Sequence, residues 1–158
     1  MKPAAWHAFI IAFFAAVSVR AAPGDDAAPA SRAPADPVLE KVMAANAQND
    51  WKRSEALLRD ALAKDPRNAD YHNLYAYAIR KGEKPNLDVV FKHYNEALRI
   101  DPKHKGAHEY IGEAYLMIGN VGKAKEHLAQ LDKLCFFSCS EYNDLKKAIA
   151  EHEKTAKR

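Results

Sequence analysis

The stretch ALAKDPRNADYH (61–72) decides the fold, because it recurs as ALRIDPKHKGAH (97–108). The two segments align without a gap and lie 36 positions apart. Both contain Asp-Pro, which ends one helix and permits another soon after, since proline disfavours helix in the residue before it. The match continues beyond the histidine, where NLYAYAI (73–79) aligns with EYIGEAY (109–115). A repeat of this period predicts an array of equivalent helical hairpins.

Helical periodicity continues from residue 37 to the end of the chain. Apolar residues recur at intervals of three and four, for example Leu57, Leu58, Ala61 and Leu62. This is the period of a helix that buries one stripe, and no segment convincingly predicts a strand. We therefore expect an all-α fold with helices over 37–48, 52–64, 68–82, 87–100, 104–118, 121–134 and 139–156.

Residues 37–134 resemble the tetratricopeptide repeat (TPR), a helix–turn–helix unit of about 34 residues with small residues where helix backbones come close. Ala76 and Ala97 take such positions in the second unit, and Gly112 and Ala124 take them in the third. One hairpin cannot bury its own apolar stripe, so neighbouring units must stack. The resemblance implies a short α-solenoid of about three hairpins, the first of them degenerate.

The C-terminal segment 135–158 is expected to form a cysteine-containing turn and a polar capping helix that closes the stack. Its sequence, LCFFSCSEYNDLKKAI from residue 134 onward, is similar to that of small exported proteobacterial repeat proteins.

The N-terminus has the three-part pattern of a secretory signal peptide. Lys2 is followed by a short, mostly apolar run, and small residues precede a cleavage site after Ala21. We expect residues 1–21 to be removed and the protein to be periplasmic or secreted, without stable membrane insertion. An uncleaved membrane anchor is the alternative. Residues 22–36, rich in Ala and Pro, predict a flexible linker.

Charge and motifs exclude several classes of function. The formal net charge of +3 falls to +1 once Lys2 and Arg20 leave with the signal, which gives no reason to expect a nucleic-acid partner. The chain has no Gly-rich phosphate loop, GxSxG or HExxH motif. We therefore expect a protein that is not an enzyme and holds no cofactor.

The two cysteines, Cys135 and Cys139, are expected to form a disulfide after export. The alternative is a redox or copper site, since two thiolates at this spacing can bind Cu(I). Their spacing resembles the Cys-x-x-x-Cys of copper-delivery proteins, which have a thioredoxin-like fold that this helical pattern does not predict.

The histidines at 104 and 108 have the i, i+4 spacing of a metal-binding pair. However, His72 and His108 share one repeat position, and His93 and His127 share another. Recurrence at equivalent positions favours a packing role, so we predict no metal site.

The functional surface is expected on the concave face formed by the first helix of each pair, as in other repeat arrays. Glutamates at 109 and 113 occupy positions where a carboxylate-binding TPR would carry cations, so we expect a mixed-charge groove for a partner segment. Its predicted residues are Asn73, Tyr77, Arg80, Lys81, Glu109, Tyr110, Glu113 and Met117.

Three functions remain open from the sequence. The first is an interaction or scaffolding module of the cell envelope that binds a segment of another protein in this groove. The second is a copper- or redox-linked periplasmic accessory protein that uses Cys135 and Cys139. The third is a structural domain that associates with itself through its first hairpin.

Overall fold

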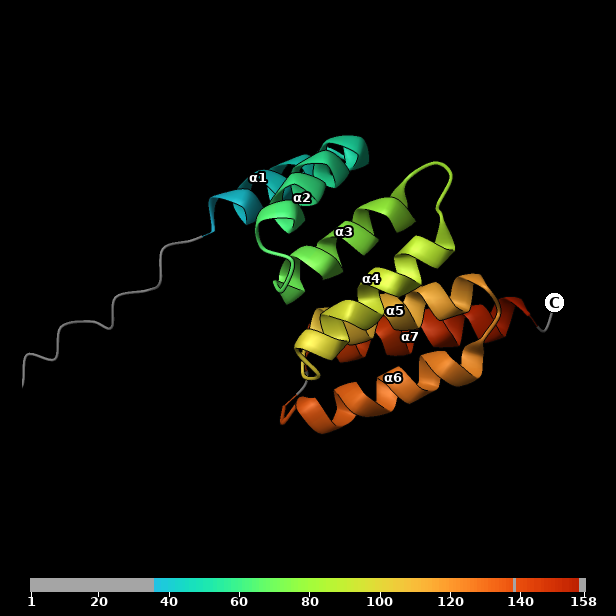
Figure 1. Cartoon of the computed structure of the whole chain (residues 1–158). Coiled ribbons are helices and arrows are strands. Elements are labelled where there is room, and N and C mark those ends of the chain that lie inside the picture. Colours follow the sequence, from blue (N-terminus) through green and yellow to red (C-terminus); the bar gives the residue numbers. More distant parts are fainter. Residues whose placement is uncertain (1–35, 138, 157–158) are drawn as a thin grey trace, which may run out of the picture. The chain divides into compact units, whose positions relative to one another are not determined.

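The structure is a computed structural model that describes residues 36–137 and 139–156. Within these residues the chain is all-helical, with seven α-helices and no strand (Figure 1). All seven predicted helices are confirmed, with ends that differ by at most one residue. They are α1 (Pro37–Ala47), α2 (Trp51–Lys64), α3 (Ala69–Lys81), α4 (Leu87–Ile100), α5 (Lys105–Met117), α6 (Val121–Leu134) and α7 (Ser140–Thr155). The expected signal peptide lies outside the described residues.

Short polar residues fix where the helices begin. Asp36 precedes Pro37 and accepts a hydrogen bond from the backbone nitrogen of Val38 at 2.8 Å. Asp50, Asn68, Asn86 and Asn120 likewise accept a backbone hydrogen bond from the third residue after them. Such caps satisfy backbone donors that have no partner inside the helix.

Small residues lie where the helices pack, as the repeat pattern predicts. The side chains of Ala76, Ala97 and Ala124 are fully buried. Gly112 is also buried, and a Cβ atom placed on it would lie only 2.6 Å from Cδ2 of Leu145 on α7. The close approach of α5 and α7 therefore depends on a residue without a side chain.

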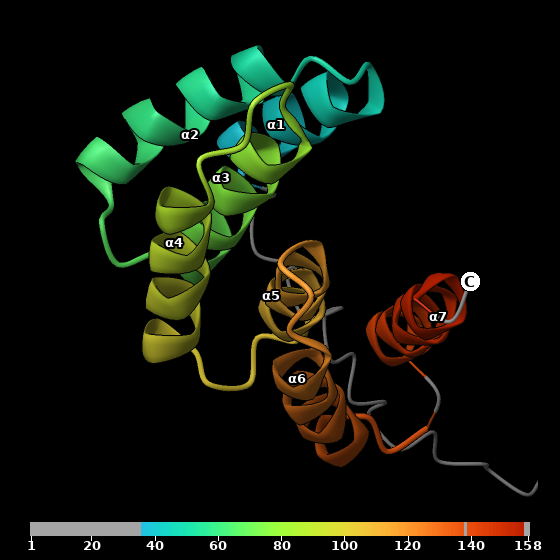
Figure 2. The same ribbon diagram turned by 90° about the vertical axis from the view of Figure 1, so that its right-hand side faces the viewer.

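Consecutive helices lie side by side along the whole described chain (Figure 2). Alternate helices meet as well, since α5 contacts both α3 and α7. Three apolar clusters follow one another along the array, centred on Leu58, Tyr94 and Leu131. Each cluster contains side chains from neighbouring helices, so adjacent hairpins bury each other's apolar residues.

Across the described helices, none combines the length and the apolar character that crossing a membrane requires.

Candidate functional site

An aromatic row, formed by Trp51, Tyr77 and Tyr110, crosses α2, α3 and α5. The ring centroids of Trp51 and Tyr77 are 5.7 Å apart in an edge-on arrangement, and those of Tyr77 and Tyr110 are 4.7 Å apart. All three side chains are partly exposed. Rings held in this way offer rigid apolar area together with polar edges, which is typical of protein-binding surfaces.

Arg80 packs against two rings of this row and bonds to residues of neighbouring helices. Its side chain is only 8% exposed, and its Cζ atom lies 5.4 Å from the ring centroid of Tyr77 and 5.7 Å from that of Tyr110. Nη2 donates to Oε2 of Glu113 at 2.6 Å, and Nε donates to the hydroxyl of Tyr94 at 3.2 Å. Arg80 therefore joins α3, α4 and α5 through a buried network instead of being free to meet a ligand.

Two of the predicted groove residues carry a buried polar group to which no described residue donates a hydrogen bond. Glu109 is 8% exposed, and no hydrogen bond or ion pair to its carboxyl is found within the described residues. Burial raises the pKa of Glu109 to about 8, and the nearby charges of Glu113, Asp144 and Glu141 raise it further. Asn73 is 4% exposed, and its Oδ1 has no hydrogen-bond partner within the same part of the chain.

The predicted groove residues thus differ in how accessible they are to a ligand. Tyr77, Arg80, Tyr110 and Glu113 come together as one group. Lys81 is exposed, with Nζ 6.0 Å from the ring centroid of Trp51, and Met117 is 48% exposed at the C-terminal end of α5.

Sequence reasoning missed Trp51 and Tyr94. Tyr94 is fully buried on α4, where burial raises the pKa of its phenol well above the usual range. Trp51 is the first residue of α2, a helix that the groove prediction did not include. Neither residue occupies a groove position of the repeat. Trp51 lies on α2 and Tyr94 on α4, whereas the groove prediction used only α3 and α5.

The histidines form two equivalent pairs, which confirms their predicted packing role. Nδ1 of His72 lies 2.8 Å from Nδ1 of His93, and Nδ1 of His108 lies 3.0 Å from Nδ1 of His127. In each pair the first histidine donates from Nε2 to a proline carbonyl, which can only accept, at 3.1 Å. In the neutral state its Nδ1 must then accept from the Nδ1–H of the second ring.

The second ring of each pair resists protonation. Burial, together with the facing histidine, lowers the pKa of His93 and of His127 to about 4. His104 faces elsewhere, because its Nδ1 accepts from the backbone nitrogen of Ala107 and its Nε2 contacts Asp70 at 3.1 Å. His104 and His108 therefore do not form a common site.

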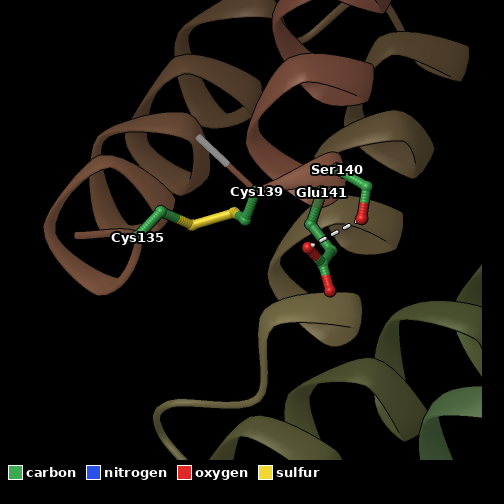
Figure 3. The surroundings of a disulfide bond; sticks show 4 residues. All are labelled: Cys135, Cys139, Ser140 and Glu141. Atoms are coloured by element: carbon green, nitrogen blue, oxygen red, sulfur yellow. Dashed lines mark hydrogen bonds between the residues drawn. A yellow bond between two sulfur atoms is a disulfide. The ribbon is translucent and has the colours of Figure 1, made fainter. Parts of the chain in front are cut away.

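Cys135 and Cys139 lie at bonding distance in the turn between α6 and α7 (Figure 3). Their Sγ atoms are 1.97 Å apart and their Cα atoms 5.8 Å apart. The loop that they close exposes Phe136 and Phe137, which are 96% and 90% accessible. Glu141, near the start of α7, accepts a hydrogen bond from Oγ of Ser140 at 3.1 Å.

We expect the double substitution Cys135→Ser/Cys139→Ser to lower the free energy of unfolding by about 2 kcal/mol, the chain-entropy value for so short a loop. Urea denaturation followed by circular dichroism measures the change. The wild-type protein treated with reductant is the matched control and should lose the same amount. Equal stability of all three samples would show that this link does not hold α7 in place.

A cleft of about 490 Å³ opens beside the aromatic row, between the turn after α1, the start of α2 and the end of α3. Trp51 forms one wall, and Ile79 and Gly82 form another. Charges of both signs surround it, including Lys52, Glu55 and Lys84. The cleft extends the surface that a partner segment could cover beyond α3 and α5.

Within residues 36–137 and 139–156, no three side chains of His, Cys, Asp or Glu come together in a way that could hold a metal ion. Comparison with models of protein families gives no match for this sequence, and comparison with curated proteins gives none either. The site is therefore characterised by its own geometry: a partly exposed aromatic row, a buried arginine network, and two buried polar groups that lack partners.

Proposed function

We propose that the protein is a TPR-type repeat protein that binds a segment of another protein on the face formed by α3 and α5. The aromatic row of Trp51, Tyr77 and Tyr110 is the observation that carries this proposal. Monomeric proteins bury most aromatic rings, whereas rigid and half-exposed rings are enriched where proteins bind one another.

The arrangement of the helices supports the TPR part of the proposal. The first helices of successive hairpins touch, since α5 meets α3 on one side and α7 on the other. The small residues Ala76, Ala97 and Ala124 are buried at the contacts, and the two histidine pairs repeat the same geometry one unit apart. An array of this kind presents the first helix of each pair on its concave face.

Export is the second part of the proposal. Residues 1–21 carry the signal-peptide pattern, and bonding of Cys135 to Cys139 suits an oxidising compartment such as the periplasm. These features support the proposal of an assembly or scaffolding role among envelope proteins.

The two other hypotheses stay predictions with distinct tests. A copper- or redox-linked role requires that Cys135 and Cys139 bind Cu(I) after reduction, which a competition titration measures. Self-association through the first hairpin requires a dimer in sedimentation experiments. Neither role depends on the aromatic row.

A pull-down from cell-envelope extract tests the proposed function. The wild-type protein should retain a partner that mass spectrometry identifies, and Tyr77→Ala should lose it because the centre of the aromatic row is gone. Lys92→Glu is the control, since Lys92 is exposed on α4, away from the row. Equal retention by wild type and Tyr77→Ala would overturn the proposal, provided circular dichroism shows that the variant is folded.

A further inference from the structure

Glu109 is a buried acid that the fold does not neutralise. It is 8% exposed, and within the described part of the chain nothing donates a hydrogen bond to its carboxyl. The rest of the side chain is enclosed, whereas the carboxyl oxygens keep some contact with solvent. A carboxyl group that loses most of its hydration and gains no donor is costly, and such groups gather at functional sites. The missing donor is therefore the first indication of a ligand.

The charges that face Glu109 are mostly of the same sign. Glu113 lies one turn later on α5, and Glu141 and Asp144 act on it from α7. The contact between Gly112 and Leu145 packs α7 against α5, so Glu141 and Asp144 belong to the helix that lies beside Glu109. Glu109, Glu113, Glu141 and Asp144 are called the acidic cluster below.

Arg80 on α3 is the cation that acts on Glu109, and it does not satisfy the acidic cluster. Its Nη2 is already bound to Glu113 and its Nε to Tyr94. The guanidinium of Arg80 therefore already has a carboxylate partner in Glu113, and it donates no hydrogen bond to Glu109 within the described residues. A further positive charge would be stabilised at this point, and a negative one would be repelled.

Asn73 gives a second, independent indication of an absent donor. Its side chain is 4% exposed, and its Oδ1 is buried without a partner in the described residues. Its Nδ2 lies 3.3 Å from the position that a Cβ on Gly106 would occupy, so the amide packs against α5 one turn before Glu109. Two acceptors on neighbouring helices thus lack donors among the described residues. Oδ1 of Asn73 is itself closed to solvent, so only the carboxyl of Glu109 is open to an incoming donor. A lysine ammonium or an arginine guanidinium carries several donors.

We propose that the acidic cluster around Glu109 receives one basic side chain, lysine or arginine, of the partner segment. This inference rests on the proposed function, and it names the chemistry that the partner must present there. The alkyl stem of the basic residue packs against Tyr77 and Tyr110, and its charged end reaches Glu109. The α7 helix, expected only to cap the stack, would then take part in recognition through Glu141 and Asp144.

The site couples binding to the release of a proton. With a pKa of about 8, Glu109 is mostly protonated at pH 7 in the free protein, and a bound cation favours its ionised form. Affinity for a basic segment should therefore rise by up to about tenfold per pH unit as the pH approaches 8. His93 and His127 contribute little to this rise, because burial lowers the pKa of each to about 4.

Selection of random twelve-residue peptides on phage, with the disulfide-bonded protein as target, tests the inference. We expect the selected peptides to share a lysine or arginine at one position. Replacing that residue by norleucine should weaken binding by about thirtyfold or more, as truncating one partner of a buried charge pair does. Glu109→Gln should weaken binding of the basic peptide by a similar factor and abolish its pH dependence.

The matched control is Glu126→Gln on α6. Glu126 is exposed and pairs with Lys123 at 2.7 Å, away from the acidic cluster, so the basic peptide should bind this variant as it binds wild type. Selected peptides without a shared basic residue, or with equal affinity for Glu109→Gln, would overturn the inference and leave the proposed function standing. Failure to select any peptide that depends on Tyr77 would overturn both.

Discussion

Gly112→Ala is expected to lower the free energy of unfolding by about 1–3 kcal/mol, the usual cost of adding a methyl group to a packed core. The new Cβ would lie 2.6 Å from Cδ2 and 2.7 Å from Cδ1 of Leu145, which real carbon atoms do not tolerate. Leu145 is fully buried in the cluster that includes Leu131 and Ile149, so its side chain has little room to move. We expect α5 and α7 to separate in response, which also moves the acids on α7 away from Glu109.

Urea denaturation followed by circular dichroism measures this loss. Gly122→Ala is the matched control, because Gly122 is exposed on α6 and the new Cβ would lie 3.7 Å from Oδ1 of Asn120, an ordinary contact distance. This substitution should be neutral or stabilising by up to about 1 kcal/mol, since alanine favours helix more than glycine does. Equal stability of Gly112→Ala and Gly122→Ala would show that α5 and α7 are not in close contact.

The sequence was sufficient to predict the helices because their boundaries are local features. Asp-Pro ends α2 and α4, and side chains such as Asn68 and Asn120 cap the helix that follows them. The small residues at 76, 97, 112 and 124 mark helix contacts because backbones can approach only there. The recurrence of histidine at equivalent positions likewise predicted packing, and two hydrogen-bonded pairs are found.

The chemistry of the candidate site could not be predicted in the same way. A repeat position indicates which face of a helix a residue occupies, but not how deeply its neighbours bury it. Arg80 and Glu109 were both expected to face a groove; the first is bound by Tyr94 and Glu113, and the second is buried beside acids of α7. These contacts join residues that are far apart in the sequence, and their geometry depends on the packing of whole helices.

Glu109→Gln is expected to make the protein more stable at pH 8, even though it should weaken recognition of a basic segment. In the folded protein the pKa of Glu109 is raised to about 8 from an ordinary value of 4.5. Between these values the folded state holds a proton that the unfolded state has released. The stability linked to this proton is therefore fully present below pH 4.5 and is lost as the pH rises to 8. The side chain of glutamine does not ionise in this pH range, and it has nearly the same size and shape as the protonated side chain of Glu109.

The advantage of the glutamine variant should therefore grow with pH, by at most about 1.4 kcal/mol per unit, and level off above pH 8. Urea denaturation of both proteins at several pH values from 5 to 9 measures it, and the contribution of the histidine pairs cancels because both proteins contain them. Glu126→Gln, in an exposed ion pair, should differ from wild type by less than about 1 kcal/mol at every pH. A constant difference between Glu109→Gln and wild type would mean that Glu109 is already ionised in the folded protein. A difference that grows would show that this carboxyl group lowers stability at neutral pH, as expected of a residue kept for binding and not for folding.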